Sequence, residues 1–259
     1  MVTASTANGS DNGMLINLDA KGLEWVCALF LSQDPVGIQE QEDGVDVHSA
    51  NQSAFGIPTR LTAKTYLFRL IYGGSAYSYS VDPDFVDVST SAKYWQRVID
   101  ATYAKYTGLG RWHESLVSEV VNTGKITVLT GREYNFVAKK NSRGELVWPR
   151  TQILNYPVQG LGAEVMAIIR VILYRLLRKH CPQALLVCTV HDSVLIDVPD
   201  EYAGLVVELC YKAFDQFPEF WTKVFDCTFN VPLRTEVQAG ANWGQMEEVK
   251  RNQIAYSYH

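Results

Sequence analysis

The best-placed candidate for chemistry in this chain is an aspartate in the polar triplet His191-Asp192-Ser193. Apolar, β-branched runs flank the triplet, at 185–190 before it and at 194–198 after it. This pattern predicts a strand, a tight turn and a second strand. A carboxylate at the tip of a hairpin has a rigid support, which suits a metal ligand or a general base. Asp and Ser are also common turn formers, so the triplet alone leaves both interpretations open.

A second aspartate, Asp19, follows the short apolar run 15–18 and precedes apolar residues at helical spacing. It is therefore expected at a strand-to-helix junction, with Glu24 on the helix that follows. The alternative role of Asp19 is to cap that helix, and the alternative for Glu24 is a solvated charge.

Four residues spaced four apart form a third candidate group: Arg60, Lys64, Phe68 and Tyr72. A Pro-Thr pair before them and a Gly-Gly pair after them predict one helix over this segment. Side chains with this spacing share one helix face. The two cations near the helix N-terminus suit a polyphosphate, and the two rings suit a stacked base. A helix with surface charges and core aromatics is the alternative.

Other polar candidates lie between these segments. His48 falls in a short predicted helix, where a lone His is more often structural than functional. Arg132 and Arg150 lie on either side of a basic loop that could contact phosphates or be solvated. Asn155 and Gln159 stand where the longest predicted helix, 163–180, begins, so their amides could contact bases or cap the helix.

The composition is that of a globular protein, with 47% hydrophobic and 20% charged residues among 259. A net charge of −5 provides no global basic field, so any nucleic-acid contact needs local patches. The five cysteines are scattered and lack a CxxC spacing, which predicts buried thiols in a reducing compartment. No apolar run reaches membrane-spanning length and no signal peptide is evident, so we expect a cytoplasmic protein, in the host cytoplasm if it is viral.

In their order along the chain, these segments resemble the polymerase core of family A DNA polymerases, over about residues 15–243. Residues 19–24 resemble motif A in its phage form, the spacing over 60–73 resembles motif B, and 191–193 resembles motif C. Four further stretches resemble other segments of the family: 46–48, 130–132, 155–160 and 240–243.

The resemblance implies an α+β fold, in which an antiparallel-sheet palm carries an inserted helical fingers subdomain. The expected parts are a flexible tail (1–13), a first palm part with motif A (14–45), fingers with motif B (46–149), a second palm part with motif C (150–246) and a C-terminal tail (247–259).

The resemblance also implies template-directed DNA synthesis with two Mg²⁺ ions, for which Mn²⁺ can substitute. Asp19 and Asp192 would bridge the two ions, and the backbone carbonyl of Ala20 would complete a site. Such ions clamp the attacking and leaving oxygens, and magnesium prefers hard oxygen ligands. Lys64 would offset charge on the leaving pyrophosphate and could donate a proton to it.

Other residues of the resemblance would hold the dNTP and the DNA. Arg60 and His48 would hold the β- and γ-phosphates, Phe68 and Tyr72 would pack near base and sugar, and Glu24 would exclude a 2′-hydroxyl. Primer-template contacts are implied for five residues: Asn155, Gln159, His191, Arg132 and Arg150.

Two departures from the family pattern shape the remaining expectations. Motif C usually ends in Glu, and Ser193 stands there instead, as in the related single-subunit RNA polymerases. Those enzymes carry a small residue where Glu24 stands, so Glu24 favours deoxynucleotides. The chain also begins just before motif A, so we expect a split or minimal polymerase with thumb and exonuclease-like regions on a second polypeptide. An RNA polymerase-like enzyme and a non-catalytic DNA-binding remnant are the alternatives.

Overall fold

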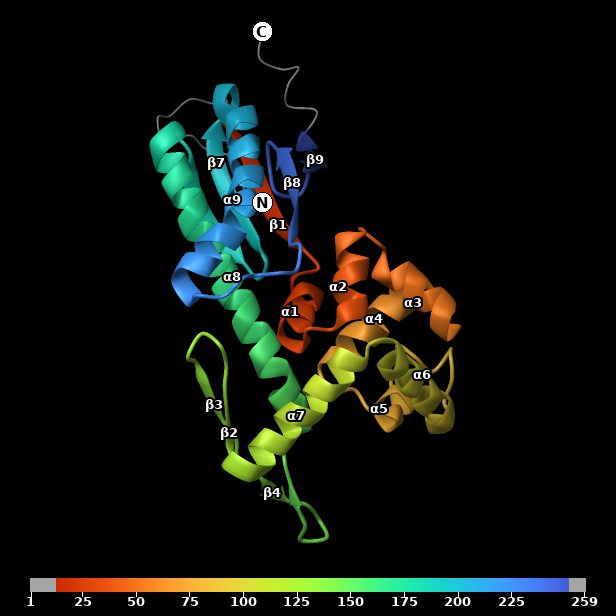
Figure 1. Cartoon of the computed structure of the whole chain (residues 1–259). Coiled ribbons are helices and arrows are strands. Elements are labelled where there is room, and N and C mark those ends of the chain that lie inside the picture. Colours follow the sequence, from red (N-terminus) through yellow and green to blue (C-terminus); the bar gives the residue numbers. More distant parts are fainter. Residues whose placement is uncertain (1–12, 252–259) are drawn as a thin grey trace. The chain divides into compact units, whose positions relative to one another are not determined.

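Residues 13–251 are described by the computed structural model, and the chain divides into two compact units (Figure 1). The first unit joins residues 13–23 to residues 162–251, and the second comprises Glu24–Leu161. The second unit is therefore an insertion in the sequence of the first. The expected tail over 1–13 lies outside the described residues except for Gly13, and so do residues 252–259 of the expected C-terminal tail.

The first unit is built on a five-stranded antiparallel sheet. Its strands, in spatial order, are β6 (Leu185–Val190), β7 (Ser193–Pro199), β1 (Gly13–Lys21), β8 (Arg234–Gly240) and β9 (Glu247–Glu248). The central strand β1 is buried on both faces over its middle part, where Leu15, Ile16 and Leu18 are at most 1% exposed and Asn17 is 8% exposed. Leu18 lies opposite Val194 on β7 and Val237 on β8, so three buried side chains form one row across the sheet.

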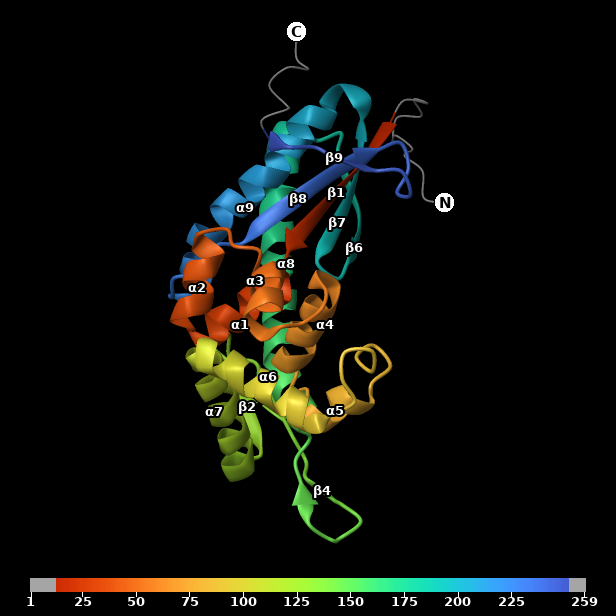
Figure 2. The same ribbon diagram turned by 90° about the vertical axis from the view of Figure 1, so that its right-hand side faces the viewer.

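Helices pack against this sheet. They are the C-terminal part of α8 (Arg150–His180), the short 3₁₀ helix η1 (Asp200–Tyr202) and α9 (Ala203–Phe225). Figure 2 shows α9 running along the sheet beside β8, and α9 contacts β1, β7 and β8. Its buried residues recur at helical spacing, including Val206, Cys210, Phe214, Phe217 and Trp221. This apolar stripe is what holds the helix on the sheet.

The second unit is mainly helical. Its helices are α1 (Leu23–Ser32), α2 (Pro35–Glu42), α3 (Val47–Phe55), α4 (Arg60–Ile71), α5 (Ala76–Val81), α6 (Ala92–Lys105), α7 (Thr107–Thr123) and the first part of α8. Two small hairpins follow α7: β2 (Lys125–Thr127) with β3 (Glu133–Asn135), and β4 (Lys139–Lys140) with β5 (Leu146–Val147).

An aromatic cluster forms the core under α4. Tyr66, Tyr79, Phe85 and Trp95 are at most 1% exposed. The Trp95 ring lies 5.2 Å from the rings of Tyr79 and Phe85 and 5.9 Å from that of Tyr66, between ring centroids. These residues come from α4, α5, α6 and the segment between α5 and α6, so the cluster fixes α4 from beneath.

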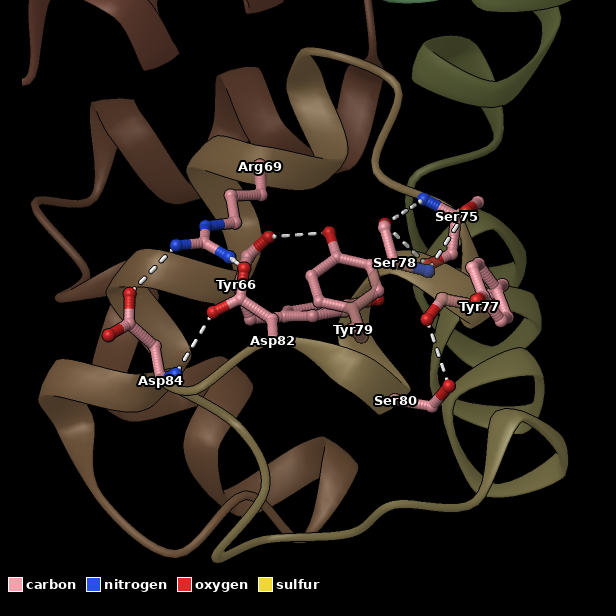
Figure 3. A network of polar contacts seen from close by, with 9 residues as sticks. All are labelled: Tyr66, Arg69, Ser75, Tyr77, Ser78, Tyr79, Ser80, Asp82 and Asp84. Carbon is pink, nitrogen blue, oxygen red and sulfur yellow. Dashed lines mark hydrogen bonds and ion pairs between the residues drawn. The ribbon is translucent and has the colours of Figure 1, made fainter.

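A polar network on the same side ties α4 to the segment around α5 (Figure 3). Arg69, near the end of α4, makes ion pairs with Asp82 and Asp84. Ser75 caps α5, because its hydroxyl accepts a hydrogen bond from the backbone N–H of Ser78 at 3.1 Å. The C-terminal end of α4 is therefore held by charge, and its middle by aromatic packing.

A buried carboxylate joins two other helices of this unit. Asp34 is 0% exposed, and its Oδ1 accepts from the backbone N–H groups of Val36 and Gly37 at the start of α2. Its Oδ2 accepts from the N–H groups of Gly108 and Leu109 at the start of α7, at 2.6 and 3.1 Å. One side chain thus satisfies four backbone donors that helix starts leave open.

Two long helices pass through proline, and this corrects the expected helix boundary at residue 163. Helix α8 begins at Arg150 and continues through Pro157, so Asn155 and Gln159 lie inside it and do not cap its start. Helix α9 likewise continues through Pro218. A proline costs one backbone hydrogen bond, which long buried helices can offset by packing.

None of the helices in residues 13–251 combines the length and the apolar character that a membrane span requires.

Candidate functional site

A two-residue turn holds His191 and Asp192 between β6 and β7, as the sequence predicts. His191 adopts a left-handed backbone conformation with φ of 51°, which a β-branched residue would resist. Ser193 begins β7, and its hydroxyl donates to the carbonyl of Val190 at 3.0 Å. The hydroxyl therefore braces the turn.

Asp19 reaches this turn because β1 pairs with β7. Asp19 lies opposite Ser193, and the backbone N–H of Ala20 donates to the carbonyl of Asp192 at 3.0 Å. The hydroxyl of Thr235, on β8, donates to the carbonyl of Asp19 at 2.8 Å. Two aspartates far apart in the sequence are thus held by backbone hydrogen bonds at adjoining ends of neighbouring strands. We call Asp19, Ala20 and Asp192 the carboxylate edge.

The carboxylate edge offers hard oxygen donors to a divalent cation. The Asp192 side chain is half-buried and makes no hydrogen bond or ion pair with any residue in 13–251. The carbonyl of Ala20 points to the same side of β1 as its N–H, which is the side of the turn. In the described part of the chain, no group of three or more His, Cys, Asp or Glu side chains is arranged to hold a metal ion. Two carboxylates and a carbonyl fit magnesium, which binds few protein ligands and keeps its waters.

The structure places one further carboxylate, that of Glu236, beside the carboxylate edge, and no sequence motif indicated it. Glu236 on β8 lies directly opposite Asp19, so both side chains project from the same face of the sheet. Lys21 forms an ion pair with Glu236 at 3.0 Å, and this contact lowers the pKa of Glu236. Only the register of β1 against β8 brings Glu236 to this place.

A separate group of side chains lies within the second unit, around the N-terminal part of α4. Thr59 caps this helix by accepting from the N–H of Thr62 at 3.1 Å. Lys64 is exposed, and its ammonium nitrogen lies 5.8 Å from the centre of the Phe68 ring. The His48 ring, on α3, lies 5.8 Å from the same ring. The spacing of four predicted that Lys64 and Phe68 share a face, and the structure adds His48.

Arg60 is held by an acidic residue that the motif spacing did not reveal. Its Nε donates to Oδ2 of Asp46 at 2.6 Å, and its Nη2 donates to Oδ1 at 3.1 Å. The Arg60 guanidinium and, less strongly, the hydrogen bonds from Ser49 hold the pKa of Asp46 well below its usual value, although burial acts in the opposite direction. We call Arg60, Lys64, His48 and Phe68 the cation face.

His48 is neutral at pH 7 in this setting. Burial, followed by the positive charge of Arg60, lowers its pKa to about 4. Its Nδ1 is buried and has no hydrogen-bond partner within residues 13–251. A neutral imidazole can still donate one hydrogen bond, so His48 can serve an anion as a donor.

A third group joins three elements of the second unit. Nε2 of Gln159, on α8, donates to Oε1 of Glu24 on α1 at 3.1 Å and to the Tyr72 hydroxyl at 2.5 Å. Tyr72 ends α4, and burial followed by its contact with Glu24 raises its pKa. We call these three residues the Gln159 bridge. The sequence predicted roles for each of them, but not that they contact one another.

The remaining predicted site residues are exposed or half-buried. Arg132 is exposed beside the turn between β2 and β3, and His191 is exposed at the tip of the first unit's hairpin. Asn155 is half-buried on α8. Arg150 begins α8 and is exposed. Contacts of these residues with DNA stay predictions.

Comparisons with known proteins agree with the family resemblance of the sequence. The model of DNA polymerase family A matches residues 4–245. DNA polymerase I of Treponema pallidum is 25% identical over 240 residues, which cover 89% of this chain and 23% of that protein. The thermostable DNA polymerase I of Thermus thermophilus is 28% identical over 242 residues, covering 88% and 27%. The DNA polymerase of Bacillus phage SP01 is 22% identical over 247 residues, covering 92% and 27%.

A solved structure shows the same fold. The POL domain of Pol1 from M. smegmatis, in complex with DNA primer-template and dNTP, aligns with a TM-score of 0.75 at 20% identity. The alignment covers 94% of this chain and 41% of that one. The predicted α+β class with an antiparallel sheet is confirmed. The chain spans about a quarter of the length of the curated relatives.

Proposed function

The chain belongs to DNA polymerase family A, and from that premise we propose that it carries out template-directed DNA synthesis by two-metal nucleotidyl transfer. The observation that supports this best is the β1–β7 register, which holds Asp19 and Ala20 beside the Asp192 turn. The POL domain from M. smegmatis, which shares the fold, is in complex with DNA primer-template and dNTP, and this supports the same two ligands here.

At the carboxylate edge, Asp19 and Asp192 would hold two Mg²⁺ ions, with the Ala20 carbonyl as a further ligand. When bound, the ions would supply charge stabilisation to the attacking and leaving oxygens. The chain's own task is to fix the two carboxylates, and the sheet does this through backbone hydrogen bonds. Mn²⁺ accepts the same oxygen ligands and would substitute.

The cation face would bind the triphosphate of the incoming dNTP. Arg60 and Lys64 supply positive charge at the N-terminal end of α4, where the helix dipole also favours an anion. His48 would donate a hydrogen bond from its neutral imidazole. Lys64 is exposed, and it would neutralise the leaving pyrophosphate and donate a proton to it. Phe68 would pack beside the nucleotide.

The Gln159 bridge would select the sugar. Glu24 would occupy the space that a 2′-hydroxyl needs, and Tyr72 would pack near base and sugar. Gln159 holds both side chains through one amide nitrogen, so their positions depend on each other. DNA contacts are proposed for Asn155, Gln159, His191, Arg132 and Arg150.

In this proposal residues 14–45 and 150–246 form the palm and 46–149 the fingers. A second polypeptide with thumb and exonuclease-like regions, and a cytoplasmic location, also stay proposals. Primer extension by this chain, with and without the products of neighbouring genes, tests the split arrangement. Processive extension by the chain alone would contradict it.

The proposed activity is tested by primer extension with Mg²⁺ and all four dNTPs. The chain, with its complementing polypeptide if one is required, should extend a primer. Asp19→Ala and Asp192→Ala should each abolish extension. Retained activity in either variant would overturn the two-metal assignment, and DNA binding without extension by the unsubstituted protein would favour a non-catalytic remnant.

Ser193 keeps one alternative open, an RNA polymerase-like enzyme. The same assay with ribonucleotides separates the two, because Glu24 should block their incorporation. Efficient RNA synthesis by the unsubstituted protein would favour the alternative.

A further inference from the structure

We infer that Asp46 is a positioning residue for triphosphate binding, because its single carboxylate sets the places of both Arg60 and His48. This inference rests on the proposed function, since it concerns the binding of the same dNTP. It assigns a role to a residue for which the sequence motif suggested none.

Asp46 holds Arg60 along one edge of the guanidinium. The contacts use Nε and Nη2, at 2.6 and 3.1 Å. A guanidinium carries five N–H donors in a planar fork, so the edge that includes Nη1 stays available to a phosphate. Asp46 and a phosphate can therefore bind Arg60 together, from different sides.

The same carboxylate caps the helix that carries His48. Oδ1 of Asp46 accepts from the backbone N–H of His48 at 3.2 Å and from that of Ser49 at 3.5 Å. The Ser49 hydroxyl donates to Oδ2 at 2.7 Å. Asp46 is thus anchored to the first turn of α3, and it is Arg60 that is held in place.

Stability alone does not explain this ion pair. The side chains of Arg60 and Asp46 are 55% and 44% exposed. Ion pairs this exposed contribute little to folding, because water competes and two side chains lose freedom. Ordering the long Arg60 side chain before the dNTP arrives lowers the entropy cost of binding, which is the benefit of preorganisation.

Three variants separate the two roles of Asp46. Asp46→Asn keeps a good helix cap but loses the charge that holds Arg60, whereas Asp46→Ala loses both. Asp43→Asn is the matched control, because Asp43 is an exposed carboxylate nearby that accepts from Gln39 at 3.0 Å. Thermal unfolding should be alike for Asp46→Asn and Asp43→Asn.

The first measurement is calorimetric binding of Mg·dATP to the full protein with a primer-template whose primer lacks a 3′-hydroxyl, so that binding is not followed by incorporation. Asp46→Asn should raise the dissociation constant about tenfold, the effect of weakening one hydrogen bond to a charged group. Asp46→Ala should raise it further, because α3 also loses its cap. In an Arg60→Ala background, Asp46→Asn should change it less than about twofold, because coupled residues are not additive.

The second measurement is single-turnover dNTP incorporation. Asp46→Asn should raise the half-saturating dNTP concentration and leave the maximal rate nearly unchanged. If the unsubstituted protein binds Mg·dATP and Asp46→Asn binds it as well or better, the inference is wrong and the proposed function stands. If the unsubstituted protein neither binds Mg·dATP nor incorporates it, the proposed function fails and the inference fails with it.

Discussion

The carboxylate edge and the cation face position their side chains by different means. At the carboxylate edge, backbone hydrogen bonds fix the position of Asp192. The Ala20 N–H donates to the Asp192 carbonyl at 3.0 Å, and the Asp192 side chain has no partner among residues 13–251. At the cation face one side chain holds another, as Asp46 holds Arg60 at 2.6 Å. The Gln159 bridge follows the second pattern.

This difference separates substitutions that should act locally from those that should spread. A carboxylate that is held through its backbone can lose its charge without moving its neighbours. The expected consequence is then only the loss of its contact with the cation. When a side chain that holds other side chains is removed, those side chains also lose their fixed positions. The two regions should therefore respond to substitution in different ways.

The largest effect should come from the carboxylate edge. Asp192→Asn should lower the rate of nucleotide incorporation about 10³-fold, since it removes charge aimed at the reacting centre. The free energy of unfolding should change by less than about 0.5 kcal/mol. Asp226→Asn is the control, because Asp226 is an exposed aspartate with positive φ in the same unit. A large loss of stability in Asp192→Asn would contradict the claim that the backbone, and not the side chain, holds Asp192 in place.

A buried carboxylate of the second unit should affect stability instead. Asp34→Ala should lower the free energy of unfolding by about 2–4 kcal/mol, because four backbone donors lose their acceptor. Urea unfolding measures the change, with Asp43→Asn as the exposed control. A loss below about 0.5 kcal/mol would mean that water satisfies the starts of α2 and α7 equally well.

The Gln159 bridge should show how an effect spreads. Glu24→Ala should lower the preference for dNTP over rNTP by about 10²-fold, the usual range for a steric pocket. Gln159→Ala should change it in the same direction but less, because Glu24 stays present without its support. Incorporation of matched dNTP and rNTP pairs measures both. An unchanged ratio in Gln159→Ala would show that Glu24 is held by something else.

The smallest effect is a pH dependence of stability. Burial, followed by the charge of Arg150, lowers the pKa of His113 to about 3 from its ordinary value near 6.5. The unfolded chain takes up this proton below pH 6.5 and the folded chain does not, so stability should fall as pH drops from 6.5 towards 3. His113 alone contributes at most about 1.4 kcal/mol per pH unit.

Urea unfolding between pH 6.5 and 5 isolates this contribution, because most carboxylates stay ionised there. His113→Gln should have a shallower pH slope than the unsubstituted protein. His48 should add a slope of the same sign and of nearly the same size in this range, since its pKa is lowered to about 4, so the difference between His113→Gln and the unsubstituted protein is what measures His113. Equal slopes in His113→Gln and the unsubstituted protein would contradict this explanation.

Local patterns predicted much of this molecule. The apolar runs around His191 and Asp192 predicted a hairpin, and that hairpin is present, because a strand-turn-strand pattern depends on neighbouring residues. The spacing of Lys64 and Phe68 predicted one helix face for the same reason.

Contacts between distant residues could not be predicted in this way. The pairing of Asp46 with Arg60 depends on how α3 packs on α4, and the place of Glu236 depends on strand register. The apolar spacing predicted a helix that starts at residue 163, whereas α8 starts at Arg150, because packing of its buried residues offsets the hydrogen bond lost at Pro157. Gln159 contacts Glu24 only because α8 begins early enough to include it.

The central claim is that Asp19 and Asp192 form a binding site for divalent metal ions. Mn²⁺ titration followed by electron paramagnetic resonance tests it directly, with the full protein, primer-template and a non-hydrolysable dNTP analogue. Bound Mn²⁺ should be lost in an Asp19→Asn, Asp192→Asn double variant and retained in Asp226→Asn. Equal Mn²⁺ binding by the double variant and the unsubstituted protein would contradict the claim.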